Sequence, residues 1–164
     1  MFDFIKKKKS SEKGSKTLFS PVNGKTISLK NVNDEVFKIG ALGKGVAFLS
    51  DDGKINSPCE AKVVTVFDTK HAISLVTESG IEILIHFGID TVELKGEGFT
   101  SFVKNEDYVN KGDPLFYGDL ELIKSKGFDT TIMMVICNSD DFNSVDILSE
   151  NGEVLIGDDV IKIL

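Results

Sequence analysis

The chain has 164 residues, enough for one domain with a buried core. All 19 of its basic residues are lysine, so any phosphate chemistry must use histidine, lysine, hydroxyl or backbone N–H groups, without the two-pronged guanidinium of arginine. Residues 17–164 contain 13 lysines and 24 acidic residues, a net charge of −11, which disfavours nucleic-acid binding and favours a basic protein partner.

The first 16 residues differ in composition from the rest. They hold six lysines together with serine and glycine. Such a segment buries too little surface to fold, so we expect a flexible leader over residues 1–16 and one domain over residues 17–164. The alternative is a weak peripheral membrane contact through residues 1–9, in which the apolar side chains enter the interface and the lysines meet anionic lipid.

Cysteine usage and hydropathy bear on the compartment. Cys59 and Cys137 lie in no metal-binding spacing, so we expect two buried thiols in a reducing compartment. Residues 1–5 are too few for the apolar region of a signal peptide, and no apolar run reaches the length of a membrane span. These features predict a cytoplasmic protein, with any peripheral contact at the inner face of the membrane.

Short apolar runs separated by turn residues follow the leader. Val, Ile, Phe and Thr are concentrated in these runs, and Gly, Asn and Asp separate them about every eight to twelve residues, as in antiparallel sheets. The pattern predicts an all-β fold, an antiparallel β-sandwich or closed barrel, with helical turns only at residues 119–125 and 139–149. The expected strands are residues 26–29, 46–49, 62–67, 72–77, 81–87, 114–117, 131–137 and 160–164.

Two pairs of similar segments suggest an internal repeat. Residues 20–25 (SPVNGK) resemble residues 57–62 (SPCEAK), and residues 109–113 (VNKGD) resemble residues 154–158 (VLIGD). An apolar run follows each segment, and a proline is best tolerated at the start of a strand. We therefore expect two related β-halves packed as one unit.

The chain has two histidines, on neighbouring expected strands. His71 begins one strand and His86 closes the next, with a turn containing Gly80 between them. With a two-residue loop, paired residue numbers sum to 157 and His71 lies directly opposite His86. With a three-residue loop and Gly80 in a bulge, the sum is 158 and His71 lies opposite Phe87. Both registers agree with the sequence.

A pair of imidazoles suits phosphoryl transfer. A neutral imidazole, with a pKa of about 6.5, keeps a free ring nitrogen that can attack phosphorus at physiological pH. The second ring can donate a hydrogen bond to the phosphoryl oxygens. The alternatives are two unrelated histidines, one of them buried, and a zinc site, for which Glu82 and Asp90 are the nearest further ligands.

Residues 85–99 (IHFGIDTVELKGEGF) favour phosphoryl transfer. This segment resembles the signature around the phosphorylated histidine in the glucose-type IIA family of the phosphoenolpyruvate-dependent sugar phosphotransferase system. Residues 67–72 (FDTKHA) resemble the second-histidine motif of that family, and Ser57-Pro58 and residues 109–115 also fit its pattern. The resemblance extends from about Leu18 to the end of the sequence.

The resemblance implies an antiparallel β-sandwich with a shallow, apolar active face. His86 would accept a phosphoryl group on Nε2 from the carrier protein HPr and pass it to a cysteine of a IIB domain, as a transient phosphoenzyme that requires no cofactor. His71 would hydrogen-bond the phosphoryl group, mainly for onward transfer. Thr69 would orient His71 through its hydroxyl, and the Gly88 carbonyl would accept a hydrogen bond from Nδ1 of His86 and so fix the tautomer.

The resemblance also implies a docking surface around the histidines. A dry apolar rim would strengthen each electrostatic contact, although core packing is the alternative role for its members. The rim is expected to contain Phe67, Ile73, Leu84 and Val92.

Two charged residues bear on how HPr would dock. Asp90 is expected to meet a basic group of HPr, or else to be an exposed structural carboxylate. Lys44 lies between two glycines, where relatives of the enterobacterial type carry an acidic residue. Because this lysine reverses the charge, we expect the details of docking to differ there.

Two other functions are open. In this family the unphosphorylated active face also docks on permeases or kinases and inhibits them, sometimes with a zinc ion that His71 and His86 would share with the partner. The chain would then be a regulatory binding module. A zinc-dependent hydrolase on a similar scaffold is disfavoured, because a third protein ligand is not evident.

Overall fold

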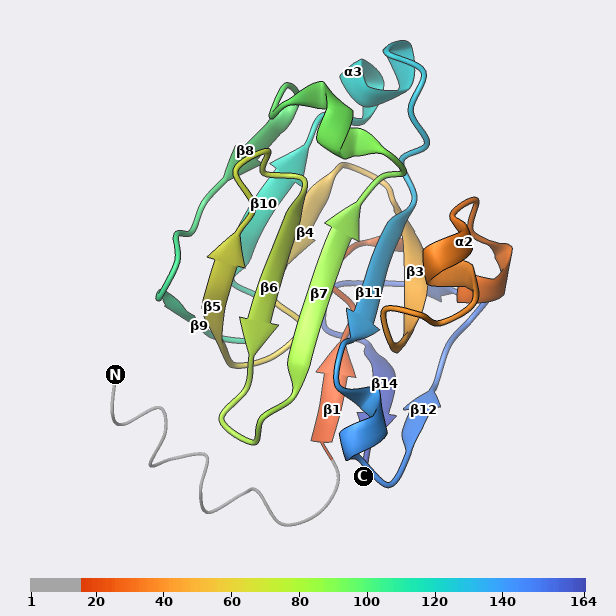
Figure 1. The fold of residues 1–164 in the computed structure, drawn as a ribbon, viewed down its shortest axis with the longest axis vertical. Helices are drawn as coiled ribbons and strands as arrows, with labels where there is room; N and C mark the ends of the chain where they lie inside the picture. Colours follow the sequence, from red (N-terminus) through yellow and green to blue (C-terminus); the bar gives the residue numbers. More distant parts are fainter. Residues whose placement is uncertain (1–15) are drawn as a thin grey trace.

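The computed structural model describes residues 16–164, and Figure 1 shows that they form a strand-rich domain. The predicted leader and its membrane contact lie outside the described residues, apart from Lys16, which begins the first strand. The strands are β1 (Lys16–Phe19), β2 (Gly24–Ile27), β3 (Lys44–Ser50), β4 (Lys54–Asn56), β5 (Ala61–Val66), β6 (Ala72–Val76), β7 (Glu82–Phe87), β8 (Phe99–Ser101), β9 (Tyr108–Val109), β10 (Pro114–Gly118), β11 (Ile132–Ile136), β12 (Val145–Ile147), β13 (Glu153–Val154) and β14 (Asp159–Ile163).

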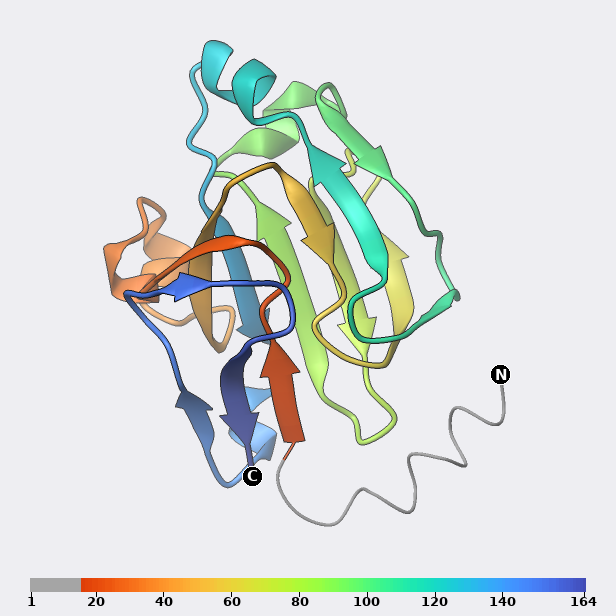
Figure 2. The ribbon, with the colours of Figure 1, turned by 180° about the vertical axis from the view of Figure 1, so that it is seen from behind.

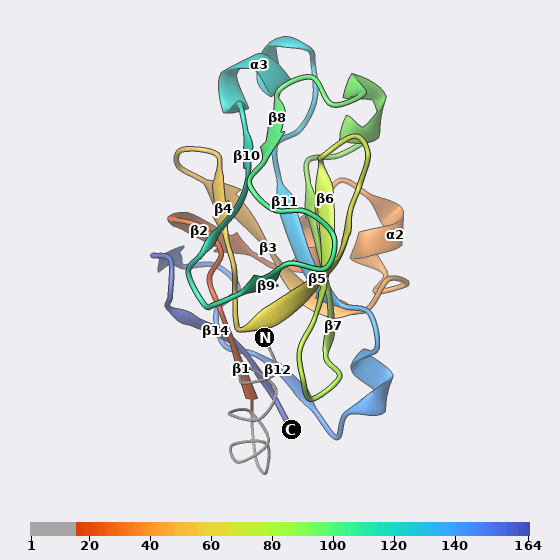
Figure 3. The same ribbon diagram turned by 90° about the vertical axis from the view of Figure 1, so that its left-hand side faces the viewer.

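The strands form three antiparallel sheets. The largest has eight strands in the order β13-β2-β3-β11-β7-β6-β5-β9, and the hairpin β6–β7 lies inside it. The two smaller sheets have the orders β4-β10-β8 and β1-β14-β12. Figures 2 and 3 show the smaller sheets stacked on one face of the large sheet. The antiparallel β-sandwich predicted from the sequence is confirmed.

Helical segments are short. The turn expected at residues 119–125 is α3 (Leu120–Ser125), which Asp119 caps by accepting from the Leu122 N–H at 3.1 Å. The turn expected within residues 139–149 is the 3₁₀ turn η3 (Ser139–Asp141), and β12, which follows it, pairs with β14. Three further segments were not predicted from the sequence: α2 (Glu35–Lys38) and the 3₁₀ turns η1 (Leu29–Asn31) and η2 (Thr91–Leu94). Among residues 16–164, no helix is both long and apolar enough to cross a membrane.

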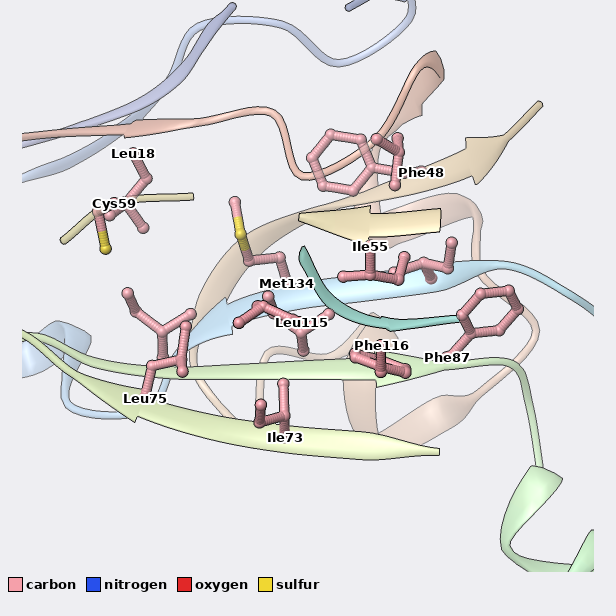
Figure 4. Close-up of a cluster of buried hydrophobic side chains, with 14 of the residues drawn as sticks. Leu18, Phe48, Ile55, Cys59, Ile73, Leu75, Phe87, Leu115, Phe116 and Met134 are labelled. Carbon is pink, nitrogen blue, oxygen red and sulfur yellow. The ribbon is translucent and has the colours of Figure 1, made fainter. Parts of the chain in front are cut away.

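Side chains of β7 alternate between the two faces of the large sheet. Ile83, Ile85 and Phe87 point into the core between the sheets, together with the alternate residues of β6 and β11. Figure 4 shows Phe87 in this core beside Phe116 of the opposite sheet. Burial of these side chains removes a large apolar area from water and stabilises the sandwich. Cys59 lies in this core as expected, whereas Cys137 is exposed, so the expectation of two buried thiols is wrong for Cys137.

A second, smaller cluster covers the outer face of the large sheet. Leu84 packs against it, and His86 lies opposite Met133, one of its members, on the neighbouring strand β11. Because directly paired residues share a face, His86 is on the outer face of the sheet. The segment from η1 to α2 provides much of this cluster, whose members are Leu29, Val32, Phe37, Ala47, Ile89, Met133 and Val135.

The internal repeat expected from the sequence is visible in the hydrogen bonds. Ser20 donates its backbone N–H to the Asp158 carbonyl at 2.7 Å, and Ser57 donates to the Asp113 carbonyl at 2.7 Å. The glycine before each aspartate donates back to the carbonyl of the same serine, at 3.1 and 2.9 Å. Each serine hydroxyl also donates to the carbonyl two residues later, at 2.7 Å in both cases. Both pairs of similar segments therefore form the same paired turns.

The close contact between the sheets at Gly118 gives a stability test. A Cβ atom at this position of β10 would lie 2.7 Å from Cζ of the buried Phe87 ring. We expect Gly118→Ala to lower the free energy of unfolding by about 1–3 kcal/mol, because the ring cannot move without disturbing the core. Denaturant unfolding followed by circular dichroism measures the change. In the control Gly152→Ala the new Cβ meets only Ser149 Oγ, at 3.3 Å, and an equal loss in both variants would contradict the packing argument.

Candidate active site

The register of the hairpin β6–β7 is the second of the two that the sequence allowed. Ala72 pairs with His86 and Ile73 with Ile85, so paired numbers sum to 158. Gly80 closes the three-residue loop with a φ of 90°, a conformation that suits glycine. The register that set His71 directly opposite His86 is wrong, because the loop has one residue more than that register requires.

The two histidine rings nevertheless meet. Their centroids are 4.8 Å apart and their planes make an angle of 84°. His71 lies just before β6, after Lys70 with a φ of 57°, so the alternation of the strand does not govern its side chain. Its backbone is fixed all the same, because its carbonyl accepts from the Phe87 N–H at 2.7 Å. The bend at the start of β6 therefore brings the pair together.

His71 is packed against aromatic rings. Its side chain is buried, and the rings of Phe67 and Phe99 lie with centroids 5.7 and 6.4 Å away. Burial, with a smaller contribution from the charge of His86, lowers the pKa of His71 to about 4. Its Nδ1 lies 2.6 Å from the Thr69 hydroxyl, the contact that the resemblance implied. The ring is therefore neutral near pH 7 and fixed in orientation.

His86 is half-buried, and the groups that shift its pKa differ from those that act on His71. Burial lowers the pKa of His86, while the backbone carbonyl of Gly88 and the negative charges of Asp34 and Asp90 raise it in part. Nδ1 of His86 is buried and makes no hydrogen bond of normal geometry. The nearby backbone carbonyl of Gly88 is the acceptor available to Nδ1, although the two groups do not form a hydrogen bond of normal geometry in the structure.

The loop after β7 requires glycine at position 88. Gly88 has a φ of 88°, and a Cβ atom there would lie 2.3 Å from Cγ2 of the buried Thr91. The Gly88 N–H donates to the Thr131 carbonyl at 2.7 Å, and the Thr91 hydroxyl donates to the Phe87 carbonyl. These bonds fix the loop, and with it the direction of the Gly88 carbonyl.

The expected docking rim is only partly present. Phe67 and Val92 are exposed, at 37% and 51% of their surface, and Leu84 is half-buried on the same face of the sheet as His86. Ile73 is wrong as a rim residue, because it is 1% exposed and points into the core between the sheets. Asp90 is exposed at the start of η2.

Lys44 is not brought to the histidines. It begins β3, where alternation groups it with Val46 and Phe48 of the inner core and apart from Ala47 of the outer cluster. Its strand position is therefore on the opposite face from His86. The structure gives this lysine no contact with the predicted active face.

The segment around α2 was not predicted from the sequence. Asp34 caps this helix by accepting from the Val36 and Phe37 N–H groups at 2.9 and 3.3 Å, and the Phe37 ring lies 5.3 Å from the ring of His86. An aspartate before a short apolar pattern is a signal for a helix start, although it does not reveal what the helix covers. The segment also contributes three exposed apolar residues: Val36, Ile39 and Leu42.

The histidine pair falls short of a metal site within this chain. Over residues 16–164, no three His, Cys, Asp or Glu side chains are placed to hold a metal ion. A zinc ion on His71 and His86 would therefore need ligands from outside the described part of the chain.

The low pKa of His71 predicts acid-sensitive stability. The unfolded chain binds a proton at His71 as the pH falls below about 6.5, whereas the folded protein binds it only near pH 4. Stability from this residue is therefore complete above about pH 6.5 and is lost progressively towards pH 4. Denaturant unfolding at pH 7 and pH 5 should show a smaller difference for His71→Gln than for the unchanged protein. An NMR titration midpoint for His71 near 6.5 would contradict the prediction.

Comparison with protein families places these observations in context. The model of the family described as "phosphoenolpyruvate-dependent sugar phosphotransferase system, EIIA 1" matches residues 16–142. The glucose-specific EIIA component of Oceanobacillus iheyensis is 41% identical over 145 residues, which cover 88% of each chain. That of Halalkalibacterium halodurans is 42% identical over 123 residues, or 75% of this chain and 71% of the relative.

Fused relatives and a solved structure agree with this assignment. The beta-glucoside-specific EIIBCA component of Bacillus subtilis is 43% identical over 126 residues, 77% of this chain, and this chain spans only about a fifth (21%) of its length. The structure of the glucose permease IIA from Mycoplasma capricolum matches with a TM-score of 0.78 and 38% identity, covering 91% of this chain and 96% of that one. The chain therefore belongs to the EIIA 1 family of the phosphoenolpyruvate-dependent sugar phosphotransferase system, whose members are phosphotransferase components.

Proposed function

We propose that the chain is a cytoplasmic phosphocarrier in which His86 takes a phosphoryl group from phospho-HPr and passes it to a cysteine of a IIB domain. The observation that carries this proposal is the contact between the two imidazoles, 4.8 Å between centroids, on a fixed hairpin. Membership of the EIIA 1 family supports the phosphocarrier role, and the fused EIIBCA and EIICBA relatives support a IIB partner.

In this mechanism, His86 is the nucleophile. With its proton on Nδ1, directed at the Gly88 carbonyl, the lone pair of Nε2 is free to attack phosphorus. The Nε2–P bond forms while the N–P bond to the HPr histidine breaks, and that histidine keeps the electron pair of the broken bond. Burial favours this step, because it lowers the pKa of His86 and so keeps the ring uncharged.

His71 stabilises the phosphoryl group. The Thr69 hydroxyl lies 2.6 Å from Nδ1, and when it donates to that nitrogen the ring proton of His71 is on Nε2. That N–H donates to a phosphoryl oxygen beside His86, and the surrounding aromatic rings strengthen the interaction by excluding water. In onward transfer an S–P bond to the IIB cysteine forms as the Nε2–P bond of His86 breaks.

The surroundings of the histidines suit a protein partner. Exposed apolar side chains such as Phe67 and Val92 would be covered on docking, and the carboxylates of Asp34 and Asp90 would meet basic groups of HPr. These exposed apolar side chains also favour the second candidate function, in which the unphosphorylated face inhibits permeases or kinases. The transfer itself requires no cofactor, and a regulatory zinc ion would need ligands from the partner.

Phosphorylation of the purified protein tests the main proposal. Incubation with phosphoenolpyruvate, enzyme I and HPr should add one phosphoryl group, labile in acid and stable in base, as seen by intact mass. His86→Ala should abolish labelling completely, because it removes the nucleophile. Labelling of His86→Ala at the normal level would place the acceptor elsewhere, and no adduct on the unchanged protein would end the phosphocarrier proposal.

His71→Gln separates acceptance from donation. The variant should still accept the phosphoryl group, since His86 is intact, but transfer to a IIB domain should slow by about 100-fold, the typical cost of losing one donor to developing charge. Quenched-flow transfer from the phosphorylated variant to a IIB domain measures the rate. A donation rate equal to that of the unchanged protein would remove His71 from the mechanism.

A further inference from the structure

The carboxylate of Asp129 links two segments that the sequence separates by almost a hundred residues. One oxygen, Oδ1, accepts from the Thr131 backbone N–H at 2.8 Å and from the Thr131 hydroxyl at 2.6 Å. The other, Oδ2, accepts from the Asn33 side-chain amide at 3.3 Å. None of these contacts involves His86, yet one segment holds the loop that carries the Gly88 carbonyl and the other leads into the helix that carries the Phe37 ring.

The first segment, the turn at Asp129 and Thr131, holds the loop that carries the Gly88 carbonyl. The Ile89 N–H donates to the Asp129 carbonyl at 3.0 Å, and the Gly88 N–H donates to the Thr131 carbonyl at 2.7 Å. The turn that the Asp129 side chain closes is therefore the same turn that holds the loop after β7. Because that loop aims the Gly88 carbonyl, the geometry of this turn sets the position of the acceptor for the buried Nδ1 of His86.

The second segment carries the Phe37 ring. Asn33 directly precedes Asp34, the residue that caps α2, so a bond to Asn33 holds the start of this helix. The Phe37 ring, on the buried side of α2, lies 5.3 Å from the His86 ring at an angle of 60°. A four-residue helix has little stability of its own, so its place over the sheet depends on such contacts.

We propose that Asp129 is a positioning residue that holds the His86 ring between the Gly88 carbonyl and the Phe37 ring. Its kinetic consequence rests on the proposed phosphocarrier function, because transfer between aligned atoms depends on the orientation of the nucleophile. Its structural consequence concerns the unphosphorylated protein alone. Without the carboxylate, the Gly88 loop and the α2 segment lose their common anchor, and the proton of His86 is no longer confined to Nδ1.

The first test measures the tautomer of His86 by long-range ¹H–¹⁵N NMR. We expect one tautomer, protonated on Nδ1, in the unchanged protein and a mixture of tautomers in Asp129→Ala. Asp129→Asn should restore the single tautomer, because its amide oxygen can still accept from both Thr131 donors and so keep the turn that holds the Gly88 loop. Its NH2 group cannot replace Oδ2 as the acceptor for the Asn33 amide, so this variant keeps the Gly88 side of the anchor and loses the α2 side. Identical ¹⁵N shifts for His86 in Asp129→Ala and in the unchanged protein would overturn the proposal.

A matched control separates positioning from general loss of stability. Asp158 likewise accepts a backbone N–H in a turn, that of Leu155 at 2.9 Å, but its turn pairs with Ser20 and touches neither segment around His86. Asp158→Ala should lower stability and leave the His86 tautomer unchanged. A tautomer mixture in this control as large as that in Asp129→Ala would assign the effect to stability alone and overturn the proposal.

The second test measures acceptance from phospho-HPr. Asp129→Ala should lower the maximal rate by about tenfold, the low end of the loss when an outer hydrogen-bond partner of a functional histidine is removed, with little change in KM for phospho-HPr. Asn33→Ala breaks only the link to α2 and should lower the maximal rate by a smaller factor. This variant still tests the proposal if Asp129→Ala does not fold. An unchanged rate in both variants contradicts the proposal. Absence of phosphorylation in the unchanged protein contradicts the proposed function instead, and the tautomer measurement then decides the positioning role.

Discussion

Strand β7 lies between β6 and β11 in the eight-stranded sheet, so its backbone is held on both edges and its side chains are forced alternately to the two faces. Phe87 is buried between the sheets, where Gly118 leaves room for its ring, and the preceding residue His86 must then reach the outer face. A slip of one residue would send the imidazole into the core. The position of His86 thus depends on the packing of its apolar neighbour.

The environment of the two histidines explains how phosphoryl chemistry is possible in a chain without arginine. Burial disfavours the charged form of each ring and lowers both pKa values. Two neutral imidazoles lie side by side without mutual repulsion, whereas two imidazolium ions 4.8 Å apart in an apolar setting would repel each other. Neutral rings supply both of the groups that the proposed transfer requires, a nitrogen lone pair and an N–H donor.

The strands and the repeated turns could be predicted from local sequence patterns, because they depend on residues that are close together in the sequence. The register of the hairpin was left open because turn chemistry around Gly80 permits two loop lengths, and the choice between them is made by pairing across the sheet. The predicted contact between the two histidines is present, but it does not arise from direct pairing of the residues. It arises because the bend after Lys70 redirects the side chain of His71. Family resemblance, more than spacing, singled out Thr69, which does contact His71.

The errors have a common physical origin in a sheet that is covered on both faces. Strand β6 reads AISLV and β7 reads EILIHF, apolar on both sides, so alternation alone does not distinguish the core from the outer face. Ile73 and Leu84 therefore looked equivalent, although the first is in the core and the second beside the outer cluster. The α2 segment and Asp129 were missed because their roles arise from contacts between distant parts of the chain.

The ends of the described domain also bear on how it would work. Strand β1 pairs with β14, with Lys16 opposite Ile163, and both strands pack on the inner side of the large sheet. The polypeptide therefore enters and leaves at neighbouring points, in the layer behind the one that presents the histidines (Figure 1). A neighbouring domain tethered at either end would attach away from the outer face. An attachment at Lys16 or Leu164 would therefore leave the outer face, with its two histidines, uncovered.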